Sequence, residues 1–232
     1  MLSLKRIQTI FIKDYKDLMK NSYMLSTAIM PLLFAFLFGR GEEVELIVSI
    51  VPITLAMVIV GSFVQAAMIA EEKEKNTLRG LLLSPLSTSE VFIGKSLLSA
   101  VLTAIMIAGV ILISGFPIPE NTLLFIVAIF ISLVIYIGIG TILGLMSRTV
   151  METTVVGMPV LIIFGMSSLF RNFFESEWLF NILSYLPDVQ FATLVLNLHQ
   201  GLPVGENLVI LGIWALVTIV ITVLIYKRRR FD

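Results

Sequence analysis

The chain of 232 residues contains no cysteine and only one histidine, His199. The lack of cysteine excludes a disulfide framework, a thiolate metal site and a thiol nucleophile. A single histidine with no second kind of ligand near it is a poor basis for a metal centre, so we expect His199 to serve packing or the surface. The sequence therefore predicts no catalytic residues and no metal site, and we expect the chain not to be an enzyme by itself.

Charged residues are scarce as well, at 14% of the sequence, whereas hydrophobic residues make up 58%. Soluble domains carry roughly a quarter charged residues. This deficit indicates a protein that lies in a lipid bilayer. The formal net charge is zero, and we expect the bilayer, and no nucleic acid, among the partners of the chain.

Six apolar windows meet or approach the length of about 20 residues that a membrane-spanning helix needs. They are residues 21–39, 46–70, 91–115, 122–146, 153–170 and 207–226. Five are free of charge, and the third holds Lys95 one turn inside its start, where a long side chain can snorkel to the membrane surface. The pattern predicts an all-α polytopic membrane protein with six transmembrane helices.

Two segments outside these windows are also apolar. Residues 2–19 carry hydrophobic side chains at helical spacing, which predicts an amphipathic helix on the inner membrane surface. Its many charges argue against a cleaved signal peptide. Residues 171–206 contain two apolar stripes separated by Pro187, each too short to cross a bilayer. We expect a re-entrant or interfacial pair of short helices there, on the outer side.

The basic residues give the orientation. With the six windows as spans, every lysine and arginine except Arg40 and Arg171 falls on one side. Because cytoplasmic loops carry the excess of Lys and Arg, both termini are expected in the cytoplasm. We expect the protein in the plasma membrane of a bacterial cell.

The segment between the second and third windows, residues 71–90, is predicted to be a cytoplasmic loop with a distinct pattern. It opens with the mixed charges Glu71 to Lys75, continues through leucines, and turns at Ser84-Pro85 before a helix cap. One interpretation is a solvated loop whose charges only enforce topology. The leucines, however, are more apolar than such a loop needs, and a proline-fixed turn makes the hairpin rigid. This combination favours docking onto a partner protein.

The loop and the topology together resemble ABC-2 type ABC transporter permeases, the membrane subunits of ATP-driven exporters. The positions that match are Glu71, Glu72, Glu74, Thr77, Leu78, Leu81, Leu82, Ser84, Pro85, Gly94 and Lys95. The resemblance implies that residues 1–232 form one ABC-2 transmembrane domain. It also implies a dimer with a second permease copy or a close paralogue, bound to cytoplasmic ATPases. The matching residues from Glu71 to Pro85 are then the expected ATPase-coupling interface.

Gly94-Lys95-Ser96 is not a nucleotide-binding motif. A P-loop has another glycine five residues before its Gly-Lys pair, and that position is Ser89. We therefore expect no cofactor in this chain, with ATP and Mg²⁺ bound by the partner subunit.

The leading hypothesis for function is the permease subunit of an ABC exporter. Charge-free spans suit a hydrophobic or amphipathic substrate, with a drug or membrane-active peptide favoured. A lipid-linked polysaccharide or a lipid is the alternative cargo. The rival class is a carrier or channel that needs no ATPase, but such proteins usually place ionisable residues deep in the membrane. Gly140 and Gly144 are predicted to serve close helix packing instead of substrate passage.

Overall fold

The computed structural model describes residues 3–39, 45–77, 87–170 and 177–229, and every regular element in these ranges is helical. Helices in the first half are α1 (Leu4–Lys20), α2 (Ser22–Phe38), α3 (Leu46–Leu55), η1 (Ala56–Val64), α4 (Gln65–Glu74) and α6 (Thr88–Ser114). Those in the second half are α7 (Thr122–Met146), α8 (Val150–Gly165), α9 (Ser167–Phe170), α10 (Glu177–Ser184), α11 (Pro187–Gln200) and α12 (Gly205–Arg229).

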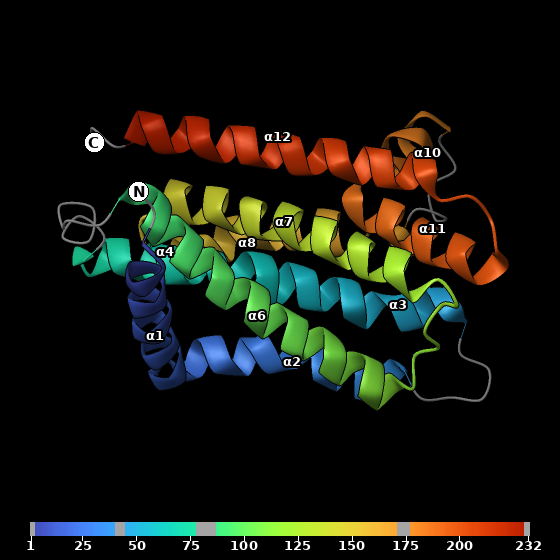
Figure 1. Ribbon diagram of the computed structural model, residues 1–232, viewed down its shortest axis with the longest axis horizontal. Coiled ribbons are helices and arrows are strands. Elements are labelled where there is room, and N and C mark those ends of the chain that lie inside the picture. Colours follow the sequence, from blue (N-terminus) through green and yellow to red (C-terminus); the bar gives the residue numbers. More distant parts are fainter. Residues whose placement is uncertain (1–2, 40–44, 78–86, 171–176, 230–232) are drawn as a thin grey trace.

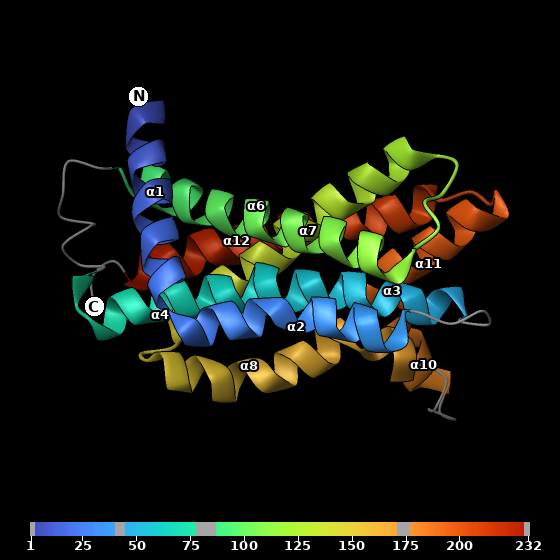
Figure 2. The same ribbon diagram turned by 90° about the horizontal axis from the view of Figure 1, so that it is seen from below.

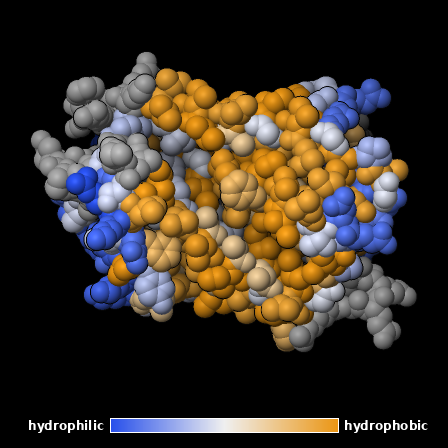
Figure 3. All heavy atoms as spheres, in the orientation of Figure 1, coloured by the Kyte–Doolittle hydropathy of each residue, from blue (hydrophilic) through white to orange (hydrophobic). Residues whose placement is uncertain are grey.

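The long helices run side by side as a bundle, with α1 lying across one end (Figures 1 and 2). We call this the α1 end of the bundle. Both α1 and the C-terminal end of α12 lie there, whereas α10 and the start of α12 lie at the opposite end. On the face shown in Figure 3, apolar residues form a belt across the middle of the bundle and polar residues gather toward its two ends. This distribution is the one that a bilayer imposes on a spanning bundle.

Within the described ranges, four helices are long and apolar enough to cross a membrane: 46–74, 90–114, 122–146 and 205–226. The number rises to six if each of two bent pairs, α1 with α2 and α10 with α11, counts as one span. The prediction of an all-α polytopic membrane protein is confirmed. The predicted number of six spans equals the upper count, but the two sets of helices differ. The prediction counted the window 153–170 as a span, whereas α8 is a shorter apolar helix of 16 residues.

The segment 46–74 is the central helix of the bundle. Of its apolar window 83% is buried inside the protein, compared with 11% for α12. Its middle, η1, is a π-helix, and its small residues admit a close neighbour. A Cβ added to Gly140 of α7 would lie 2.2 Å from the carbonyl oxygen of Ser62, and one added to Gly144 would lie 2.8 Å from that of Ala66. The close packing predicted for these two glycines is confirmed.

Several boundaries differ from the apolar windows. The second window ends at residue 70, but its helix continues to Glu74, and α6 already begins at Thr88. The segment 71–90, expected to be a coupling loop that ends in a helix cap, is therefore helical at both ends. The window 153–170 is divided at Met166 into α8 and α9. In the predicted outer insertion, α10 and α11 meet at a bend of 78°, and residues 171–176 lie outside the described ranges.

Candidate functional site: the charged α1 end

The charged run Glu71–Lys75 lies at the α1 end of the bundle, where α4 ends and the connection to α6 begins. Among the residues predicted to contact an ATPase, Glu71, Glu72 and Glu74 belong to α4, and Thr77 follows it. The remaining predicted contacts fall outside the described residues: Leu78, Leu81, Leu82, Ser84 and Pro85.

Four charged side chains from three helices form a closed arrangement that we call the charge ring. Lys13 and Asp14 come from α1, Glu72 from α4 and Lys95 from α6. Lys13 Nζ lies 3.1 Å from Asp14 Oδ1, Asp14 Oδ2 lies 3.0 Å from Lys95 Nζ, and Lys95 Nζ lies 2.9 Å from Glu72 Oε2. The ring closes where Glu72 Oε1 meets Lys13 Nζ. Positive and negative charges alternate, and each carboxylate uses both of its oxygens.

The ring is largely shielded from solvent. Lys95 is 1% exposed, Asp14 3% and Glu72 6%. The expectation that Lys95 snorkels to the membrane surface is wrong, because two carboxylates inside the protein neutralise its ammonium group. A buried charge without partners would be costly, whereas each charge here faces opposite charges on two sides.

Lys13 is the least buried member of the ring. Burial by itself would lower the pKa of Lys13, but the hydrogen bond and negative charge of Glu72, together with Asp14, outweigh it and hold that pKa above its usual value. Lys13 therefore stays protonated at neutral pH.

Sequence reasoning missed Lys13 and Asp14. Asp14 occupies the buried face of α1, at helical spacing from Ile7, Ile10 and Leu18. A carboxylate in line with buried hydrophobic residues was the available signal that it has an internal partner.

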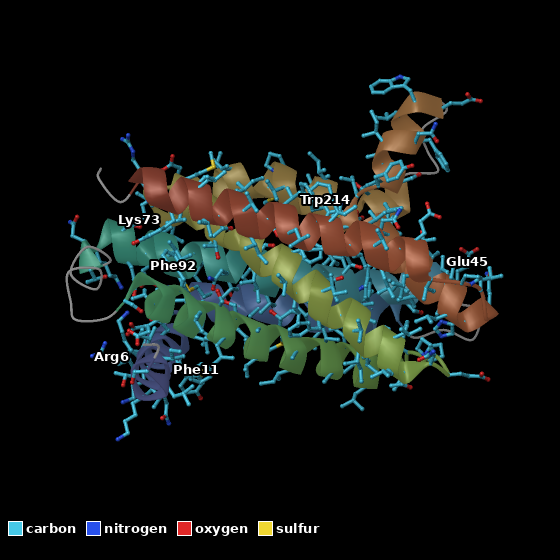
Figure 4. The ribbon with its side chains drawn as sticks, turned by 45° about the horizontal axis from the view of Figure 1, so that its top comes forward. Arg6, Phe11, Glu45, Lys73, Phe92 and Trp214 are labelled. Atoms are coloured by element: carbon cyan, nitrogen blue, oxygen red, sulfur yellow. The ribbon has the colours of Figure 1, made fainter. Side chains whose placement is uncertain are left out.

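Other residues of the charged run point to different helices. Lys73 Nζ donates to the carbonyl oxygen of Leu145 at 2.7 Å and to that of Ser147, so it caps the C-terminal end of α7. The start of α8 is held by Glu74, whose Oε2 accepts from the Val150 N–H at 3.1 Å. The labelled Lys73 lies beside the end of α4 in Figure 4.

Glu71 completes the pattern by reaching the turn between α1 and α2. It pairs with Lys75 at 2.5 Å and accepts from Asn21 Nδ2 at 3.2 Å. The hydrogen bond that Lys75 donates to Glu71, together with the negative charge of Glu71, raises the pKa of Lys75. The charged run is therefore not a solvated loop: Glu71 to Glu74 connect the end of α4 to α1, α2, α6, α7 and α8.

The start of α6 is fastened to α1 in the same region. Ser87 and Glu90 form a capping box, in which Glu90 Oε2 accepts from the Ser87 N–H at 2.8 Å. Glu90 Oε1 also accepts from the Ser3 N–H at 2.7 Å, and Arg6 lies 3.6 Å from Glu90. The helix cap predicted before the third span is confirmed at Ser87.

Two adjoining cavities open beside the charge ring, of ≈ 230 Å³ and ≈ 270 Å³. Both are lined by Asp17, Glu71 and Lys75, so they form one groove between the end of α1 and the end of α4. Its walls carry both signs of charge, which suits polar side chains of another protein better than an apolar ligand. Among the described residues, no group of three or more His, Cys, Asp or Glu side chains could hold a metal ion.

His199 lies at the opposite end and packs within the protein. Its Nδ1 lies 2.9 Å from the carbonyl oxygen of Val195, its Nε2 lies 2.9 Å from that of Pro117, and its ring meets Phe116 edge-on. Packing, one of the two roles expected for this histidine, is confirmed.

Comparison with protein families matches the chain to the ABC-2 family transporter proteins over residues 7–224. The matched range begins inside α1 and ends near the end of α12, so it includes the charge ring and the whole bundle. Comparison with curated proteins finds no match.

Proposed function

Because the chain belongs to the family of ABC-2 transporter proteins, we propose that it forms the membrane pathway of an ATP-driven exporter in a bacterial plasma membrane. The family makes it a permease subunit of an ABC transporter, which works with a separate ABC ATPase subunit. In our proposal the α1 end faces the cytoplasm, both termini are cytoplasmic, and the ATPase docks there. ATP and Mg²⁺ then belong to the ATPase and not to this chain.

The charge ring and the charged run are the observation that carries this proposal. The connection from α4 to α6 leaves the bundle at Glu74 and returns at Thr88, and the ring joins α1, α4 and α6 just inside these two points. A partner that displaces the connection therefore acts on three helices at once. Because the same ion pairs hold α1, α4 and α6 together, these three helices should move as a unit when the ATPase binds.

Within this proposal the predicted interface residues have two roles. Glu71 and Thr77 line the groove, and with Glu74 they present the end of α4 to the partner. Leu78, Leu81, Leu82, Ser84 and Pro85 supply the contact along the connection itself. Glu72 contributes indirectly, because its carboxylate faces Lys13 and Lys95 and holds α4 in place.

Two features support an apolar pathway and a second subunit. The middle parts of the apolar windows carry no Asp, Glu, Lys or Arg, which favours a hydrophobic or amphipathic substrate such as a drug or a membrane-active peptide. A lipid-linked polysaccharide or a lipid is the alternative cargo for the same pathway. Large apolar side chains are exposed along α8 and α12, including Val155 and Leu216. Lipid and a second permease copy or paralogue cover these faces in our proposal.

The test is purification of the tagged chain from its native membranes in mild detergent, with mass spectrometry of the proteins that accompany it. We expect a stoichiometric ABC ATPase with the wild-type chain and its loss with Leu81→Asp. Leu202→Asp is the matched control, because Leu202 is an exposed leucine in a connection at the opposite end of the bundle. It should retain the ATPase.

A wild-type chain that purifies without any ATPase contradicts the proposal and favours a carrier or channel that works alone. Retention of the ATPase by the Leu81 variant, with unchanged coupling of hydrolysis to export, contradicts the assignment of the connection as the contact.

A further inference from the structure

Helix α1 crosses the end of the bundle at 87° to α2, so it lies along the membrane surface if the bundle spans the membrane. One face of α1 packs against α6 through the buried residues Ile7, Ile10 and Leu18. The remainder of the helix surface is divided between an exposed apolar face and a cationic stripe, and together they indicate what lies beside α1.

The exposed apolar face carries side chains that a helix end in water would not favour. Leu4 is 83% exposed, Met19 52% and Tyr15 49%. Figure 4 shows Phe11 on the side of α1 toward the length of the bundle, and Arg6 on the side away from it. The apolar face of α1 is therefore turned toward the level of the apolar belt, at the depth where acyl chains meet headgroups.

The cationic stripe consists of Lys5, Lys16 and Lys20, with Thr9 on the same line of the helix, and all four side chains are exposed. At about 100° per residue, their spacing places them within about 60° of arc beside the apolar face, opposite the face that packs on α6. Within the described part of the chain, no carboxylate lies at ion-pair distance from Lys5, Lys16 or Lys20. The two acids of α1, Asp14 and Asp17, both pair with Lys13 instead.

We propose that the stripe of Lys5, Lys16 and Lys20 binds the phosphate groups of anionic phospholipids in the leaflet in which α1 is embedded. The apolar face sets the depth of the helix, and the lysines beside it then lie at the level of the headgroups. Each lysine near an anionic surface gains favourable free energy, and the effect falls off within a Debye length. This interaction concerns lipid alone, so it does not depend on which ATPase or cargo the chain serves.

The lack of cysteine in the natural sequence allows a site-specific test. Met19→Cys on the exposed apolar face is labelled with a bimane fluorophore, and the full chain is placed in phosphatidylcholine nanodiscs. About 20 mol% of the lipid is brominated on its acyl chains and is either phosphatidylglycerol or phosphatidylcholine. We expect about threefold stronger quenching by the brominated phosphatidylglycerol, and a fall toward equal quenching in about 0.5 M NaCl.

In the variant Lys5→Gln/Lys16→Gln/Lys20→Gln, both brominated lipids should quench the bimane fluorescence equally. The matched control Lys5→Arg/Lys16→Arg/Lys20→Arg keeps the charge and should behave as the unsubstituted stripe does. Because these side chains are exposed, neither set disturbs the buried contacts of α1. Equal quenching in the chain with its natural lysines, or an unchanged preference in the glutamine variant, overturns the proposal.

Discussion

Asp14 and Lys95 are 81 residues apart in the chain, yet Asp14 Oδ2 and Lys95 Nζ form an ion pair of 3.0 Å that is almost completely buried. The pair joins a helix that lies across the end of the bundle to a helix that runs along it. It is also one side of the charge ring, so its energetics are tied to Lys13 and Glu72. Residues that share partners in this way do not have additive effects when they are substituted.

Replacing Lys95 with methionine should destabilise the protein by about 3–5 kcal/mol, because Asp14 and Glu72 lose a buried partner. The double variant Asp14→Asn/Lys95→Met should cost less than the sum of the two single changes. The Lys13–Glu72 pair remains in the double variant, and one uncompensated charge has been removed. Thermal unfolding in detergent measures all three free-energy differences. Strictly additive costs would show that the two residues do not interact.

Gly140→Ala should destabilise the packing of α7 on η1 by about 1–3 kcal/mol. The added Cβ would lie 2.2 Å from the Ser62 carbonyl oxygen, and backbone on both sides must move to admit it. Gly212→Ala on α12 is the matched control, since nothing lies within 4 Å of its added Cβ. The control should be neutral or slightly stabilising, because alanine has a higher helix propensity than glycine. Equal melting temperatures for both variants would argue against the close approach of α7 and η1.

Lys73→Met should loosen the C-terminal end of α7. The carbonyl oxygens of Leu145 and Ser147 lose their donor, and the negative end of the helix dipole loses its cation. We expect a cost of about 1–2 kcal/mol. Faster hydrogen exchange near the end of α7 is the local readout.

Lys75→Met provides the comparison for Lys73, because Lys75 pairs with Glu71 at the surface. Exposed pairs contribute about 0–1 kcal/mol, so this variant should leave exchange in α7 unchanged. Equal hydrogen-exchange rates near the end of α7 in both variants would show that Lys73 does not cap this helix.

The apolar runs predicted the helical bundle because a spanning helix must satisfy its backbone internally and present apolar side chains to lipid. Helix α7 occupies the same residues, 122–146, as its apolar window. Hydropathy did not predict that the helix continues through Glu71–Glu74, because it places the end of a buried helix at the first charged residues. Here each charge has a partner on another element, so the helix continues for one more turn. Those partners lie far away in the sequence, and neither spacing nor composition identifies them.

The same limit applies to the candidate site. The sequence located the charged connection and the cap before α6, because both are local patterns. It did not locate the ring, because burial of Lys95 depends on Asp14 approaching from α1 and Glu72 from α4. A lysine near the start of a span is ordinarily interpreted as reaching water. Only the tertiary arrangement shows that this lysine reaches carboxylates instead.

The right angle between α1 and α2 gives the ring a mechanical consequence. Helix α1 lies across the end of the bundle and is joined to α4 and α6, so a movement of either helix is passed on to α1. Because Lys13 and Asp14 of α1 pair with Glu72 of α4 and Lys95 of α6, a tilt of α4 or α6 is expected to change the angle at which α1 lies on the membrane surface. If the ATPase acts on the connection between α4 and α6, as we propose, part of the energy that it delivers also moves α1 against the membrane surface. The stiffness and lipid composition of that surface then affect the energy that the movement requires.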